Sequence, residues 1–110
     1  MARETVDILE DKLAEDIVLL DIQGLSPFAD YFVICSGTSE RQIRALVSSV
    51  REGIKKDLDK LPRNIEGEPF SGWVLMDYSD VVVHIFSPEV RDYYDLEGLW
   101  QEGKVLLHMQ

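Results

Sequence analysis

This sequence has few of the side chains that build metal-binding or disulfide-linked sites. Its 110 residues include one cysteine, Cys35, and two histidines, His84 and His108. A single cysteine cannot form a disulfide within the chain, and neither histidine has a cysteine or carboxylate at the spacing of zinc ligands. The sequence therefore predicts no internal disulfide, no metal site and no cofactor.

Long apolar segments and an excess of positive charge are also missing. No apolar run reaches the roughly 20 residues of a membrane-spanning helix, and no secretory apolar segment opens the chain. Twenty-one acidic side chains against 11 basic ones give a net charge of −10, which repels a phosphate backbone. We expect a cytoplasmic protein that binds neither membranes nor naked nucleic acid. The negative charge either keeps the domain soluble or complements a basic protein.

The stretch from Trp73 to Trp100 carries the clearest structural signals. Residues 73–77 and 81–86 are β-branched and aromatic runs, and the D-Y-S-D segment between them favours a chain reversal, so they predict an antiparallel hairpin. Its second strand has almost no polar alternation, which is typical of a central strand covered on both faces. Ser87 and Pro88 predict the start of a short helix over residues 88–94. We expect three later side chains to close one side of the core: Leu96, Leu99 and Trp100.

Helical and strand patterns alternate in the first part of the chain. Residues 3–14 predict a short amphipathic helix, and residues 17–22 and 31–35 predict two buried strands. A long helix is predicted over residues 40–60, where apolar side chains recur every three or four residues, and residues 63–70 are predicted to form a loop. The expected apolar stripes are Val6, Leu9 and Leu13 in the first helix, and Ile43, Leu46, Val47, Val50, Ile54 and Leu58 in the second.

These elements predict a single α/β domain over residues 1–110, with a mixed β-sheet flanked by helices. The domain is long enough to bury about two thirds of the surface that the unfolded chain exposes, so it needs no disulfide or metal ion to fold. Residues 101–110 include the apolar segment V-L-L-H-M, which is either a tail or an extra strand.

Two segments fit either a structural or a catalytic role. Gly37-Thr38-Ser39 precedes the long helix, where Ser39 and Gln42 match a capping box, but the turn is also placed to cradle a phosphate. Asp77 and Asp80 flank the hairpin turn, where they either form the turn or chelate Mg²⁺. Together, the two segments allow a nucleotidyltransferase as an alternative function.

Three other residues have simpler interpretations. His84 lies inside a strand, so we expect a hydrogen-bonded core or interface residue rather than a general base. Cys35 ends a buried strand without a cation beside it, and burial raises a thiol pKa. Trp73 shares one strand face with Leu75 and Asp77, and it either covers the core or stays open to a partner, since tryptophan is enriched at protein interfaces.

Three motifs together resemble the ribosomal silencing factor family, also called Iojap-like or RsfS. The motifs are D-Y-F-V-I-C-S-G-T-S at 30–39, W-V-L-M-D-Y-S-D-V-V-V-H-I-F at 73–86 and R-D-Y-Y-D-L-E-G-L-W at 91–100. The resemblance implies a nucleotidyltransferase-like α/β domain that is not an enzyme. It also implies binding to a large-subunit ribosomal protein on the intersubunit face, number fourteen of that series.

The implied mechanism is steric: the bound factor blocks association with the small subunit and so represses translation. Free members of the family tend to be homodimers. The family's contact strand corresponds to the first strand of the hairpin. The expected contact residues are Trp73, Leu75, Met76, Asp77, Tyr78 and Asp80.

Overall fold

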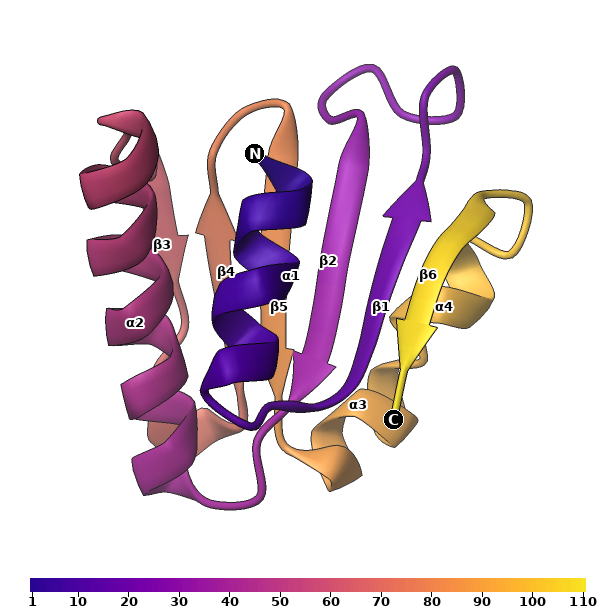
Figure 1. The fold of residues 1–110 in the computed structure, drawn as a ribbon. Helices are drawn as coiled ribbons and strands as arrows, with labels where there is room; N and C mark the ends of the chain where they lie inside the picture. Colours follow the sequence, from indigo (N-terminus) through magenta and orange to yellow (C-terminus); the bar gives the residue numbers. More distant parts are fainter.

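A mixed sheet of six strands forms the centre of the computed structural model, which describes residues 1–110 (Figure 1). The elements in chain order are α1 (Ala2–Asp11), β1 (Glu15–Asp21), β2 (Tyr31–Ser36), α2 (Glu40–Leu58), β3 (Asn64–Glu66), the 3₁₀ turn η1 (Pro69–Ser71), β4 (Trp73–Asp77), β5 (Val81–Phe86), α3 (Pro88–Tyr94), α4 (Leu96–Leu99) and β6 (Lys104–Met109).

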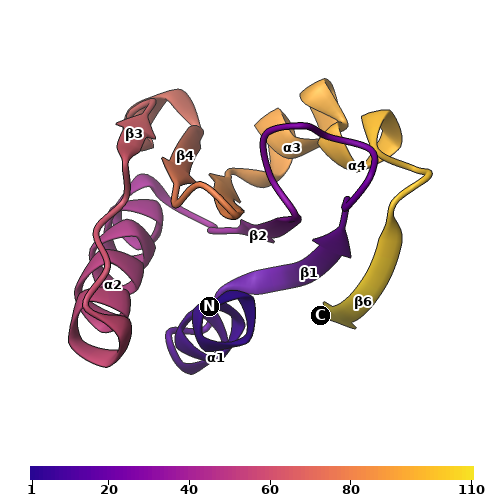
Figure 2. The same ribbon diagram turned by 90° about the horizontal axis from the view of Figure 1, so that it is seen from above.

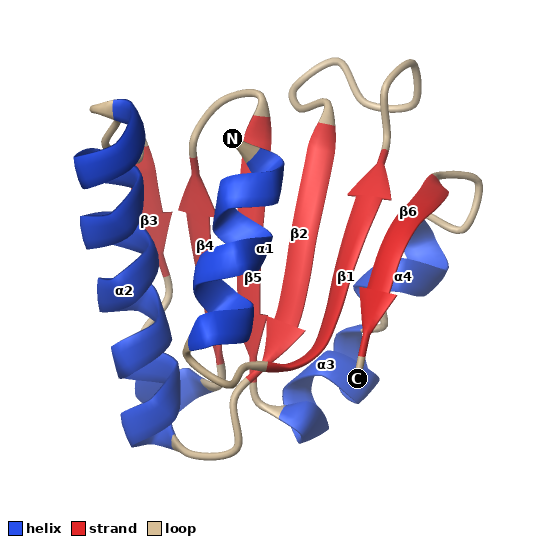
Figure 3. Ribbon diagram, in the orientation of Figure 1, coloured by secondary structure: helices blue, strands red, loops and turns tan.

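The strands lie side by side in the order β3-β4-β5-β2-β1-β6. Strands β2 and β5 are parallel, and every other neighbouring pair is antiparallel. Figure 2 shows α1 and α2 on one face of the sheet and α3 and α4 on the other, and Figure 3 marks the helices and strands. The predicted α/β class, the hairpin and the central position of its second strand are confirmed.

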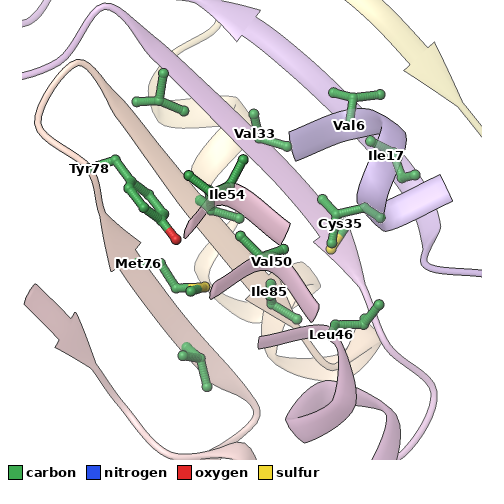
Figure 4. Packing of buried hydrophobic residues seen from close by; sticks show 14 of the residues in the cluster. Val6, Ile17, Val33, Cys35, Leu46, Val50, Ile54, Met76, Tyr78 and Ile85 are labelled. Atoms are coloured by element: carbon green, nitrogen blue, oxygen red, sulfur yellow. The ribbon is translucent and has the colours of Figure 1, made fainter. Parts of the chain in front are cut away.

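The larger core lies between the sheet and the first two helices, and we call it the α1/α2 core. Its members are Val6, Leu9, Ile17, Leu19, Val33, Cys35, Ile43, Leu46, Val50, Ile54, Val74, Met76, Tyr78, Val81, Val83 and Ile85. Most of the predicted helical stripe points into this core (Figure 4). Leu13 does not, because α1 ends at Asp11 and Leu13 adopts a left-handed φ of 65°, which leaves its side chain 77% exposed.

The second core lies on the opposite face of the sheet, and we call it the α3/α4 core. It contains Val18, Leu20, Ile22, Ala29, Phe32, Ile34, Phe86 and Leu96, with Trp73, Val82, Val90 and Trp100 packed against it. Leu96 and Trp100 close this core as predicted, but Leu99 is 75% exposed. Helix α4 is a single turn that ends at Leu99, and Trp100 at its C-cap, rather than Leu99, packs against the core.

The two edges of the sheet differ from the sequence-based expectations. Residues 104–109 form strand β6, which pairs with β1. From the sequence, a tail and an extra strand were both possible for this segment. Residues 64–66 form the short edge strand β3 rather than part of a loop, because Ile65 pairs with Met76 on the free edge of β4. Three residues between polar neighbours give no alternation long enough to predict a strand.

Side chains cap two helices near the ends of the central strands. Ser39 accepts a hydrogen bond from the Gln42 N–H at 3.1 Å, and Ser87 accepts one from the Val90 N–H at 3.3 Å. The reciprocal half of the predicted capping box is wrong, because the Gln42 side chain accepts from Thr38 N–H instead, at 2.7 Å. These caps fix where the chain leaves β2 and β5.

Candidate partner-binding site

Strand β4 points its alternate side chains to opposite faces of the sheet, as predicted. Trp73, Leu75 and Asp77 point to the α3/α4 face and are partly exposed, whereas Met76 points into the α1/α2 core. Met76 is 0% and Tyr78 8% exposed, and both lie in the core that α2 covers (Figure 4). Of the expected contact residues, these two have buried side chains, whereas Trp73, Leu75 and Asp77 are partly exposed.

A groove opens beside the exposed face of β4, and we call it the Trp73 groove. Its volume is about 320 Å³, and it is lined by Glu66, Gly67, Ser71, Trp73, Leu75, Val90 and Tyr94. The lining comes from the β3–β4 edge of the sheet and from α3, two segments that the hairpin alone did not indicate. Leu75, Val90 and the two aromatic rings make its walls apolar, and the Glu66 carboxylate makes its rim negative.

The turn between β3 and β4 approaches strand β4 closely at Gly67. Gly67 has a φ of +88°, and a Cβ atom there would lie 2.1 Å from the Trp73 carbonyl oxygen. Only glycine fits both the left-handed conformation and this close contact. The glycine therefore lets the chain turn directly against the strand that carries Trp73.

The Trp73 ring is held by contacts on three sides. It stacks on Phe86 with a centroid distance of 4.8 Å and an interplanar angle of 27°, and it contacts Tyr94 at 4.9 Å. Its Nε1–H donates a hydrogen bond to Nδ1 of His84 at 3.2 Å. The indole thus contributes to the α3/α4 core and to the groove wall at once.

His84 occupies a buried position behind the groove, in agreement with the expected hydrogen-bonded role. The side chain is 3% exposed, and burial lowers its pKa from 6.5 to about 3. The imidazole is therefore neutral near pH 7. Its second nitrogen, Nε2, is buried and has no hydrogen-bond partner.

Asp77 and Asp80 lie at the hairpin turn and serve its geometry. Asp77 Oδ1 accepts a hydrogen bond from the Ser79 N–H at 2.7 Å, and its Oδ2 pairs with Arg63 at 3.1 Å. The Asp80 carbonyl oxygen accepts from the N–H groups of Asp30 and Tyr31. No group of three His, Cys, Asp or Glu residues converges in the structure. The side-chain contacts of Asp77 favour a role in the turn over metal chelation, and neither aspartate belongs to a converging group of three such residues.

Gly37 and Thr38, in the turn before α2, already use their hydrogen-bond donors. Gly37 N–H donates to the Phe86 carbonyl at 2.8 Å, and both the N–H and the hydroxyl of Thr38 donate to Gln42. A phosphate cradle requires such groups to be free. Cys35, just before the turn, is fully buried, which raises the pKa of its thiol to about 12. This region therefore favours a structural role over nucleotidyl transfer.

The family model described as "Ribosomal silencing factor during starvation" matches residues 1–109 of this chain. The chain belongs to this family. A ribosomal silencing factor of Bacillus subtilis is 43% identical over 94 residues, covering 86% of this chain and 79% of that protein. A crystal structure of a Chromobacterium violaceum protein is 38% identical, has a TM-score of 0.85, and covers 91% of this chain and 82% of that one.

Another member of this set of relatives is a longer mouse protein. It is named "Mitochondrial assembly of ribosomal large subunit protein 1" and is 35% identical over 98 residues, covering 86% of this chain but 42% of the mouse protein. None of the helices combines the length and the hydrophobicity that a membrane-spanning segment needs.

The hairpin pattern indicated Trp73 and Leu75, but not the other residues that line the groove with them. Glu66 and Gly67 were assigned to a loop, and Val90 and Tyr94 to a helix with no stated role. The available sequence signals for these residues were Gly67, which lies two residues before Pro69, and the adjacent tyrosines Tyr93 and Tyr94. Neither shows from sequence alone which face of the sheet the helix covers.

Proposed function

We propose that this chain is a ribosomal silencing factor that binds the large ribosomal subunit. The proposed contact is a ribosomal protein on the intersubunit face, number fourteen of the large-subunit series. The observation that carries the proposal is the family match over residues 1–109. The name of the mouse relative, which refers to the large subunit, supports the choice of subunit.

The Trp73 groove supplies the physical basis for such a contact. Interfaces gain most of their energy from a few central aromatic anchors surrounded by a polar rim. Trp73, Leu75 and Tyr94 provide an apolar centre, and Glu66 adds a negative charge to the lining. Asp77 and Asp80 add negative charge at the hairpin turn, at the other end of β4. Glu66 forms no ion pair within the chain, so its charge is free to meet a basic partner.

Inhibition of subunit joining then follows from the size of the bound domain and needs no chemical reaction. The domain measures 33 × 33 × 24 Å along its principal axes. A body of this size bound between the subunits occupies space that the small subunit requires. The proposed factor therefore represses translation by preventing subunit association, and it acts in the cytoplasm, where the ribosomes of a bacterial cell are found.

We further propose that the free protein is a homodimer. The groove leaves aromatic and aliphatic side chains open to solvent, and apolar surface of this kind favours association with a second copy. The dimer gives way to a monomer when the same surface binds the large subunit.

A subunit-joining assay tests the proposed function. Purified large subunits are incubated with the protein, small subunits are added, and a sucrose gradient separates joined from free subunits. We expect the protein to co-sediment with large subunits and to reduce the joined peak in proportion to its occupancy. Joining that is unaffected at full occupancy would contradict the steric mechanism, and no co-sedimentation would contradict the partner.

A further inference from the structure

His84 is the only buried histidine of the chain, and aromatic rings surround it. Its ring centroid lies 4.7 Å from that of Phe32, 6.0 Å from that of Trp73 and 6.2 Å from that of Phe86. It stands on β5, the strand between β4 and β2. The side chain therefore lies directly behind the wall of the Trp73 groove.

The direction of its hydrogen bond fixes its chemical state. An indole nitrogen can only donate, so Nδ1 of His84 must accept the bond from Trp73 Nε1–H. The single proton of the neutral ring is then on Nε2. That Nε2–H is buried without a partner.

Packing alone does not account for a histidine at this position. A buried donor without a partner destabilises a fold, whereas an apolar ring of similar shape would fill the same space without that penalty. The group that a phenylalanine lacks is the Nδ1 acceptor. The acceptor has one partner in the structure, which is the indole of Trp73.

We propose that His84 is a positioning residue that holds the indole of Trp73 in the orientation required for docking. This inference rests on the proposed function. The hydrogen bond turns the only polar atom of the indole inward, so the ring presents carbon surface to the groove. A side chain that is already ordered loses less conformational entropy when a partner binds.

Two substitutions separate the acceptor from the packing. His84→Phe keeps an aromatic ring but removes the acceptor, and His84→Asn keeps an acceptor near the position of Nδ1 but removes the ring. We expect His84→Phe to remain folded and to bind purified large subunits about three- to tenfold more weakly, the range that follows from losing the order of one side chain. His84→Asn should recover part of this loss despite packing less well.

The indole N–H of Trp73 gives a readout that does not depend on the ribosome. We expect its NMR resonance, assigned by comparison with Trp100→Phe, to exchange slowly with solvent in the wild type and faster in His84→Phe. Nitrogen-15 spectra of the wild type should show a neutral imidazole with its proton on Nε2. The opposite tautomer would overturn the proposal without any variant.

The matched control is Val18→Ala, which removes apolar volume from the same α3/α4 core on β1, two strands away. It should lower stability and leave subunit binding unchanged. If His84→Phe binds as tightly as the wild type, or binds no more weakly than Val18→Ala, His84 is merely structural. Failure of the wild type itself to bind large subunits would instead contradict the proposed function.

Discussion

The imidazole of His84 gives the protein a specific dependence of stability on pH. Its pKa is about 3 in the folded state because burial disfavours the charged form, against 6.5 for an exposed histidine. Below pH 6.5 the unfolded chain binds a proton that the folded chain does not, so stability is present above that pH and lost as the pH falls toward 3. The loss from this one group is about 1.4 kcal/mol for each pH unit.

We therefore expect the free energies of unfolding of wild type and His84→Phe to diverge between pH 6 and 4.5. Urea titrations at several pH values measure both. The variant retains Asp16 and His108, whose hydrogen bond at 2.7 Å lowers the pKa of Asp16, so the titration of this pair cancels in the comparison. Parallel curves for the two proteins would show that His84 is not buried as a neutral ring.

At the scale of elements, a single arginine joins both short helices to the sheet. Arg91 of α3 is 6% exposed, and its Nη1 donates to the Asp16 carbonyl at 2.8 Å and to the Ser36 hydroxyl at 2.9 Å. Its Nε and Nη2 bind the Glu97 carboxylate of α4 at 3.0 and 3.2 Å. One guanidinium thus connects α3, α4, β1 and β2.

We predict that Arg91→Ala lowers the free energy of unfolding by about 3 kcal/mol, because it removes the buried guanidinium and leaves the Ser36 hydroxyl and the Asp16 carbonyl without this partner. Chemical denaturation measures the change. Asp92→Asn, at the exposed neighbouring position, is the control and should shift stability by no more than about 0.5 kcal/mol. An Arg91→Ala protein as stable as the control would mean that the helices are held by apolar packing alone.

The elements also show where sequence reasoning succeeds and fails. Long periodic segments such as α2, and strongly β-branched strands such as β5, were predicted close to their observed bounds because their patterns repeat several times. Strand β3 was missed because three residues carry no pattern and form a strand only through the neighbouring edge of β4.

The burial of Met76 and Tyr78 could not be predicted for a related reason. Alternation along β4 predicts that Trp73 and Met76 face opposite sides of the sheet. It does not predict which side α2 covers, because that depends on how the long helix packs back over the sheet. The groove joins residues from β3, β4 and α3, and such a site becomes visible only when the tertiary structure is known.

At the scale of the whole molecule, the exposed groove bears on the oligomeric state. We expect a homodimer in solution at micromolar concentration, since association with a second copy buries the apolar groove when no ribosome is present. Light scattering coupled to size-exclusion chromatography measures the mass. Adding a charge to the groove wall with Leu75→Glu should shift the population to monomer, whereas the same change at exposed Leu13 should not. A wild type that is monomeric at high micromolar concentration would contradict the expectation.

The central claim is that the Trp73 groove binds the large subunit, and the most direct measurement is subunit joining in the presence of Trp73→Ala. Truncating a central aromatic anchor typically costs about 2 kcal/mol or more of binding energy, which is roughly thirtyfold in affinity. Trp100→Ala is the matched control, because Trp100 packs against Phe32 at 5.4 Å on the same face of the sheet but does not line the groove.

Thermal melting of both variants establishes that they are folded before joining is measured. We expect Trp73→Ala to melt as a folded domain yet no longer to bind large subunits or block joining, while Trp100→Ala still does both. A folded Trp73→Ala protein that blocks subunit joining as well as the wild type would contradict the central claim and place the contact on another surface.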